Sequence, residues 1–166
     1  MAIQDIRTIG VVGCGLMGAG IAEACARAGF SVVVREVNDE LAQNGLARLR
    51  RSMQKAVERG KLSAEGMAAA LECVNVTTNL ELLNCCQLVV EAIVENLDAK
   101  RQLFAELDRL CPPGAVLATN TSSLNITAIA AATGRPETGR YRLATSPSSL
   151  SSTAILAVTE PTSMPR

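Results

Sequence analysis

The chain has 166 residues, the length of one ordinary domain with room for a substantial core. Its formal net charge is zero, so composition gives no electrostatic reason to expect binding to nucleic acid or to an anionic membrane surface. No apolar stretch is long enough to span a bilayer and the first residues do not resemble a signal peptide, so we expect a cytoplasmic protein without membrane contact.

The first predicted element is a short apolar strand that leads into a glycine-rich turn. The strand covers residues 9–12, and Gly13, Gly15 and Gly18 follow with the spacing G-x-G-x-x-G. In dinucleotide-binding proteins the first glycine permits the tight turn and the second lets the backbone approach a pyrophosphate. The third lets the next helix pack closely on the strand. Glycine-rich turns serve many purposes, but here the motif opens a predicted helix that ends at Gly29.

An acidic residue follows the second predicted strand, residues 31–34, at an informative distance. Glu36 lies 18 residues after Gly18, close to the roughly 20 expected for the acid that binds the adenosine ribose hydroxyls. A carboxylate there would repel a 2′-phosphate, so NAD is favoured over NADP as the cofactor. Two alternatives stay open: Glu36 could be an ordinary exposed acid, and the guanidinium of Arg35 could accept the phosphate.

The rest of the chain alternates between predicted helices and strands as far as residue 132. Helices are predicted over 39–59, 64–71, 97–110 and 126–132, and strands over 74–77, 87–92 and 115–119. This rhythm is typical of a doubly wound parallel sheet, so the predicted class is a Rossmann-type α/β fold. Beyond residue 137 the chain becomes rich in Ser, Thr and Pro, so we expect an NAD-binding domain over 1–137 and a loose tail over 138–166.

Three stretches resemble the NAD-binding domain of the L-3-hydroxyacyl-CoA dehydrogenase family, in particular its short-chain 3-hydroxybutyryl-CoA members. They are residues 10–23 with the glycine motif, residues 89–96 (VVEAIVEN) and residues 120–127 (NTSSLNIT). The resemblance implies hydride transfer between C3 of a 3-hydroxyacyl-CoA and NAD, with an acyl-CoA as the partner and a place in fatty-acid or butanoate metabolism. Residues 120–123 argue against another class of NAD dehydrogenase.

The same resemblance implies roles for individual residues. It places Glu95 and Lys100 beside the nicotinamide half of the cofactor, and it makes Ser122 a catalytic residue that binds the substrate's 3-hydroxyl or keto oxygen close to the cofactor. Taken alone, Glu95 and Lys100 could be an exposed acid and base, and Ser122 a helix-capping hydroxyl. Further cofactor contacts are implied at Leu16, Met17, Ala92 and Asn120, and contacts to CoA at Ser52 and Lys61.

The chain departs from the family where the general base should stand. The resemblance implies a histidine that takes the hydroxyl proton, a role typically worth about 10²- to 10⁴-fold in rate, yet the chain contains no histidine. Leu143 takes its place in an ungapped comparison, and the family's helical second domain with its dimer surface has no counterpart. We therefore expect a domain that is inactive alone, either because the coding frame shifted near Glu137 or because it is a non-catalytic NAD-binding module. Without histidine, and with six cysteines lacking zinc-site spacing, no metal site is expected.

Overall fold

A computed structural model describes residues 6–121, 123–134, 141–144 and 155–158. Five strands form one parallel sheet in the order β3-β2-β1-β4-β5, which confirms the predicted doubly wound α/β class. The strands are β1 (Thr8–Val12), β2 (Ser31–Arg35), β3 (Val74–Thr77), β4 (Leu88–Glu91) and β5 (Val116–Thr119). Because β1 pairs with both β2 and β4, the chain changes direction across the sheet beside β1, and ligands bind at such a point.

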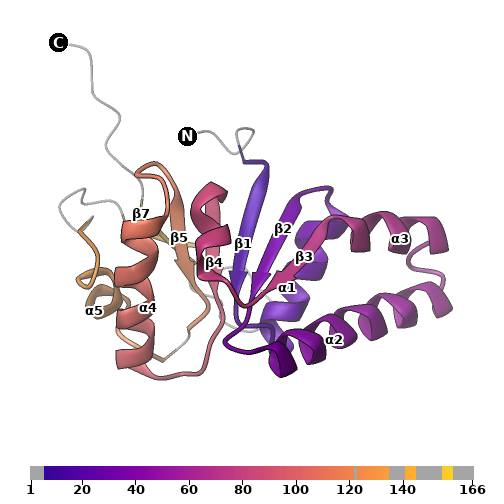
Figure 1. The fold of residues 1–166 in the computed structure, drawn as a ribbon, viewed down its shortest axis with the longest axis horizontal. Helices are drawn as coiled ribbons and strands as arrows, with labels where there is room; N and C mark the ends of the chain where they lie inside the picture. The colour runs from indigo at the N-terminus through magenta and orange to yellow at the C-terminus, as the bar shows by residue number, and fades with distance from the viewer. Residues whose placement is uncertain (1–5, 122, 135–140, 145–154, 159–166) are drawn as a thin grey trace, which may run out of the picture.

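Helices cover both faces of this sheet (Figure 1). They are α1 (Leu16–Arg27), α2 (Asp39–Glu58), α3 (Ala64–Glu72), α4 (Leu97–Leu110), α5 (Ile126–Ala130) and the 3₁₀-helix η2 (Leu80–Cys85). Helices α1, α2 and α3 pack on one face, while α4, α5 and η2 pack on the other. The sequence did not predict η2, and α5 ends two residues earlier than expected, at Ala130.

Alternating side chains of the strands supply the two cores. On β1, Val11 packs towards α2, where Leu49 and Met53 are fully buried. The next residue, Val12, packs on the opposite face towards Phe104 of α4. Strands that are buried on both faces need apolar residues at every position, which is why β1, β2 and β4 are nearly continuous apolar runs.

The helices that follow β2, β4 and β5 each begin with an asparagine cap. Asn38, Asn96 and Asn125 accept hydrogen bonds from backbone N–H groups of the first turns of α2, α4 and α5. Helix α1 differs, because its N-cap residue is Gly15, which provides no side-chain cap, and its first turn has no acidic residue. The positive end of its dipole therefore faces the carboxyl edge of the sheet without a compensating side chain.

The segment beyond residue 137 is described only in part. Strands β6 (Tyr141–Ala144) and β7 (Ile155–Val158) pair in an antiparallel arrangement, and Leu143 lies in β6. The other residues of the predicted tail lie outside the described part of the chain. The domain boundary at residue 137 therefore stays a prediction.

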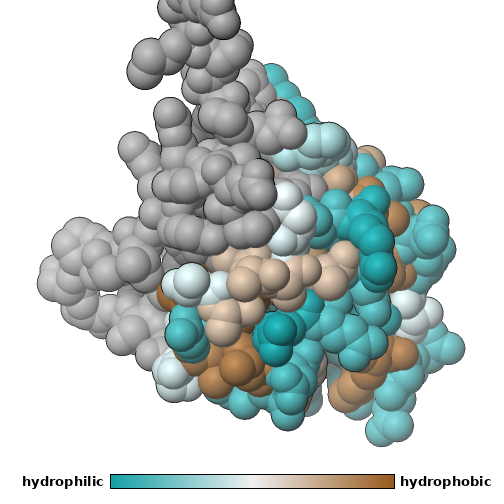
Figure 2. Space-filling model, turned by 90° about the vertical axis from the view of Figure 1, so that its left-hand side faces the viewer, coloured by the Kyte–Doolittle hydropathy of each residue, from teal (hydrophilic) through white to brown (hydrophobic). Residues whose placement is uncertain are grey.

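The surface that carries α4 and α5 mixes polar and apolar residues. In Figure 2 the coloured part of this side shows brown hydrophobic patches separated by teal hydrophilic side chains. Within the ranges that the structure describes, no helix is long and apolar enough to cross a membrane.

Candidate cofactor site

The glycine motif forms a turn that tolerates no side chain at two of its three glycines. Gly13 has a φ of 91°, and a Cβ there would lie 2.6 Å from the carbonyl oxygen of Ala92. A Cβ on Gly18 would overlap the carbonyl oxygen of Gly13, so α1 can lie this close to the turn only with glycine. At Gly15 a Cβ would meet nothing within 4 Å. The turn thus leaves open space at Gly15, where a pyrophosphate would approach the uncapped start of α1.

Helix α2 also packs closely against this turn, through a contact between Gly45 and Cys14. A Cβ on Gly45 would lie 2.6 Å from the Cβ and 2.7 Å from the Sγ of Cys14. The Cys14 thiol is buried there, and burial, with a further contribution from the charge of Glu36, raises its pKa to about 11. At neutral pH the thiol is therefore protonated, and it acts as a packing group.

Glu36 is buried rather than exposed, so the alternative of an ordinary surface acid was wrong. The residue is 9% exposed, and its carboxylate accepts hydrogen bonds from the backbone N–H groups of Cys14 and, at 3.3 Å, of Val37. These bonds hold the carboxylate directly beside the glycine turn, at the end of β2. This is the place that the ribose-binding acid of a dinucleotide site requires.

A cavity of about 660 Å³ opens between this carboxylate and helix α4. Gly13, Gly15 and Glu36 line it on the side of the turn, and Ala92 lines it at the end of β4. The rest of its lining consists of Arg35, Val37, Leu41, Ile93, Val94, Ala99, Gln102, Leu103 and Glu106. Its mostly apolar walls and few polar groups suit a flat heterocycle joined to a hydroxylated sugar.

Arg35 lines this cavity and carries one polar atom that the fold does not satisfy. Its side chain is half-buried, and its Nε atom is buried without a hydrogen-bond partner among the described residues. Buried donors without partners are rare in folded proteins, so this atom is an exception in the described part of the chain.

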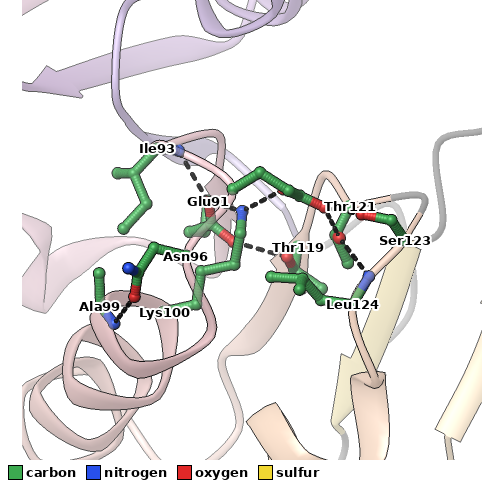
Figure 3. A network of polar contacts seen from close by, with 10 residues as sticks. Glu91, Ile93, Asn96, Ala99, Lys100, Thr119, Thr121, Ser123 and Leu124 are labelled. Atoms are coloured by element: carbon green, nitrogen blue, oxygen red, sulfur yellow. Dashed lines mark hydrogen bonds and ion pairs between the residues drawn. The ribbon is translucent and has the colours of Figure 1, made fainter.

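On the other side of β1, a buried ion pair lies at the end of β4 (Figure 3). Glu91 and Lys100 are both fully buried, and 2.6 Å separates Lys100 Nζ from Glu91 Oε1. The same oxygen accepts the Ile93 N–H at 2.7 Å, and Glu91 Oε2 accepts the Thr119 hydroxyl at 2.5 Å. A buried charge pair is tolerated only when such additional hydrogen bonds satisfy it.

Glu95 extends this pair towards solvent. Its carboxylate lies 3.3 Å from Lys100 Nζ and accepts hydrogen bonds from the hydroxyls of Thr121 and, at 2.9 Å, Ser123. Chiefly the hydrogen bond from Thr121, with help from Ser123 and Lys100, lowers the pKa of Glu95. The side chain is 40% exposed, so the carboxylate is ionised and accessible at neutral pH. Glu95 and Lys100 therefore lie in contact, and Lys100 is not an exposed base.

Glu91 and Thr119 were not among the predicted site residues. The available signal was a carboxylate at the end of an otherwise apolar strand, since a charge that enters a core requires an opposite charge nearby. Lys100 lies on the first turns of the next helix and is the partner that this reasoning would have found.

The other predicted site residues lie as follows. Leu16 and Met17 are exposed at the start of α1, and the Asn120 N–H donates to the Glu91 carbonyl at 2.8 Å. Ser52 and Lys61 are exposed on and just after α2, and neither is among the residues that line the cavity. Ser122 lies outside the described residues. The contacts of all these residues with NAD or CoA stay predictions.

Residues 8–141 match the family described as 3-hydroxyacyl-CoA dehydrogenase, NAD binding domain. The chain is 44% identical over 134 residues to a probable 3-hydroxybutyryl-CoA dehydrogenase of Bacillus subtilis, which covers 81% of this chain and 47% of that protein. The crystal structure of Mycobacterium tuberculosis FadB2 is similar at 47% identity and a TM-score of 0.78, over 79% of this chain and 46% of that one. (S)-3-hydroxybutyryl-CoA dehydrogenase from Ralstonia eutropha is similar at 37% identity and a TM-score of 0.77, over 80% and 47% of the two chains.

The chain thus spans about half the length of the relatives that it matches. Members of the matched family are NAD-dependent 3-hydroxyacyl-CoA dehydrogenases, which agrees with the NAD cofactor predicted from the glycine motif. The chain therefore belongs to the 3-hydroxyacyl-CoA dehydrogenase family and contains its NAD-binding domain.

Proposed function

We propose that this polypeptide binds NAD at the cavity beside the glycine turn and does not by itself oxidise a 3-hydroxyacyl-CoA. The observation that carries the proposal is the cavity of about 660 Å³, lined by the turn and by Glu36. The open space at Gly15 and the free start of α1 suit a pyrophosphate, and the Glu36 carboxylate suits a ribose diol.

Each half of the site has its own task in this proposal. Backbone N–H groups at the start of α1 bind the pyrophosphate, and Glu36 binds the adenosine ribose. Glu95 faces the nicotinamide half, and Ser122 binds the substrate's oxygen at C3. When bound, NAD supplies a hydride acceptor for that carbon.

The expected lack of turnover rests on the missing general base. No histidine occurs in the chain, and loss of a positioned base typically costs about 10²- to 10⁴-fold in rate. The substrate class, an acyl-CoA of fatty-acid metabolism held through Ser52 and Lys61, is proposed from the family alone. A cytoplasmic location is likewise a proposal based on the sequence.

Calorimetric titration of the purified chain with NADH, and with NADPH as the control, tests the cofactor proposal. We expect saturable binding of NADH and much weaker binding of NADPH, because the Glu36 carboxylate repels a 2′-phosphate. Absence of NADH binding would contradict the proposal, and equal binding of the two would assign Arg35 the role of a phosphate ligand.

A turnover assay separates the family's reaction from the second candidate, a non-catalytic NAD-binding module. The second candidate is favoured by the absence of histidine. We expect no loss of NADH absorbance with acetoacetyl-CoA, even at high concentration of the chain, while a complete enzyme of the family is active as the positive control. Measurable turnover would show that another group acts as the base.

A further inference from the structure

We infer that Glu91, Lys100 and Glu95 together favour the oxidised over the reduced cofactor, because they present one uncompensated negative charge to the nicotinamide side of the site. This inference rests on the proposed binding of NAD and adds a preference for its redox state. The three side chains are called the charge cluster below.

The charge cluster contains two carboxylates and one ammonium group. Lys100 forms its short contact, 2.6 Å, with Glu91, and both side chains are fully buried. Its contact with Glu95 is longer, 3.3 Å, and Glu95 is the member that reaches solvent. Thr121 and Ser123 add hydrogen bonds to Glu95 without adding charge. The cluster therefore carries a net charge of minus one, located on its exposed carboxylate.

The next charges along α4 do not cancel this excess. Arg101 Nη1 lies 3.9 Å from Asp98 Oδ1, so these two side chains compensate each other. Both are exposed, where water and salt screen them strongly.

The order of the strands places the charge cluster on the nicotinamide side. Glu36 follows β2, and the cluster lies at the ends of β4 and β5, on the opposite side of β1. A dinucleotide that crosses β1 with its adenosine at Glu36 has its other half towards β4. The oxidised and reduced cofactors differ in charge only at the nicotinamide ring, which is positive when oxidised and neutral when reduced. A nearby negative charge therefore stabilises the oxidised form selectively.

Glu91 acts as a positioning residue in this arrangement. It does not face solvent, but its charge compensates Lys100, so that Lys100 does not neutralise Glu95. Burying such a pair gives a fold little net stability, since apolar residues of similar volume often serve as well or better. The buried pair would instead serve to keep the negative charge of Glu95 uncompensated at the nicotinamide side of the site.

The test is the ratio of the dissociation constants of NAD⁺ and NADH, measured by calorimetric titration of the wild-type chain and of variants. In Glu95→Gln the amide oxygen can still accept from Thr121, while the cluster becomes neutral. We expect this variant to raise the ratio of the dissociation constant of NAD⁺ to that of NADH roughly three- to tenfold. Glu91→Gln should raise it in the same direction without any contact to the ligand, because Lys100 then compensates Glu95.

Glu36→Gln is the matched control, since it removes a carboxylate from the adenosine side of the same site. We expect this variant to weaken the binding of NAD⁺ and of NADH by the same factor, so that the ratio of their dissociation constants stays unchanged. If Glu95→Gln still binds NAD⁺ and NADH and the ratio of their dissociation constants is unchanged, the inference is wrong. It is also wrong if Glu36→Gln changes this ratio as much as Glu95→Gln does. If the wild-type chain binds neither form, the proposed NAD binding itself is wrong and the inference falls with it.

Discussion

At the scale of single residues, Lys100 shows how strongly a buried charge depends on its partner. Replacing Lys100 by Met removes the ammonium and leaves the Glu91 carboxylate buried without its cation. We expect this change to lower the free energy of unfolding by about 3–5 kcal/mol, measured by urea denaturation. The loss arises from the unpaired carboxylate more than from the missing contact.

The double variant Lys100→Met with Glu91→Gln tests that explanation. A neutral glutamine can still accept hydrogen bonds from the Ile93 N–H and the Thr119 hydroxyl, which Glu91 accepts in the native chain. We therefore expect the double variant to be more stable than Lys100→Met alone. A double variant that is less stable than the single one would mean that packing, not charge, dominates at this site.

At the scale of elements, the close approach of α1 to the glycine turn depends on Gly18. An added Cβ would overlap the Gly13 carbonyl oxygen, which is backbone and cannot rotate away. We expect Gly18→Ala to lower the free energy of unfolding by about 1–3 kcal/mol and to weaken NADH binding, as urea denaturation and calorimetry would measure.

Gly20 provides the control for this prediction within the same helix. It is exposed, and a Cβ there would meet nothing within 4 Å. Gly20→Ala should therefore raise the free energy of unfolding by up to about 1 kcal/mol through better helix propensity. Equal effects of the two substitutions would show that the contact with Gly13 is unimportant.

At the scale of the whole molecule, a ligand that binds only the folded chain must stabilise all of it. NADH at one hundred times its dissociation constant should add about 2.7 kcal/mol of stability. For a chain of this length that corresponds to a rise of roughly 5–10 °C in the thermal unfolding midpoint. NADPH at the same concentration should raise the midpoint much less, and an equal rise would contradict the role of Glu36.

The fold could be predicted from the sequence more fully than the site. Buried parallel strands leave continuous apolar runs, and Asn38 and Asn96 cap the helices that follow them, so local patterns mark these elements. The ion pair of Glu91 and Lys100 leaves only a single sign, a carboxylate at the end of an apolar strand, and Thr119, which completes it, lies 28 residues from Glu91. The burial of Glu36 depends in the same way on a backbone group of the glycine turn. Such contacts form only when the sheet brings distant strand ends together.

The polarity of the sheet also divides the molecule into an edge that holds the site and an edge that does not. The glycine turn and Glu36 follow strands and the charge cluster lies at the end of β4, whereas the exposed residues Pro112, Pro113 and Gly114 precede β5. The carboxyl ends of parallel strands share one edge, so this loop belongs to the other. It offers a position for an inserted reporter peptide or a surface-immobilisation tag, at which the chain can be attached to a sensor while its cofactor cavity stays open to solution.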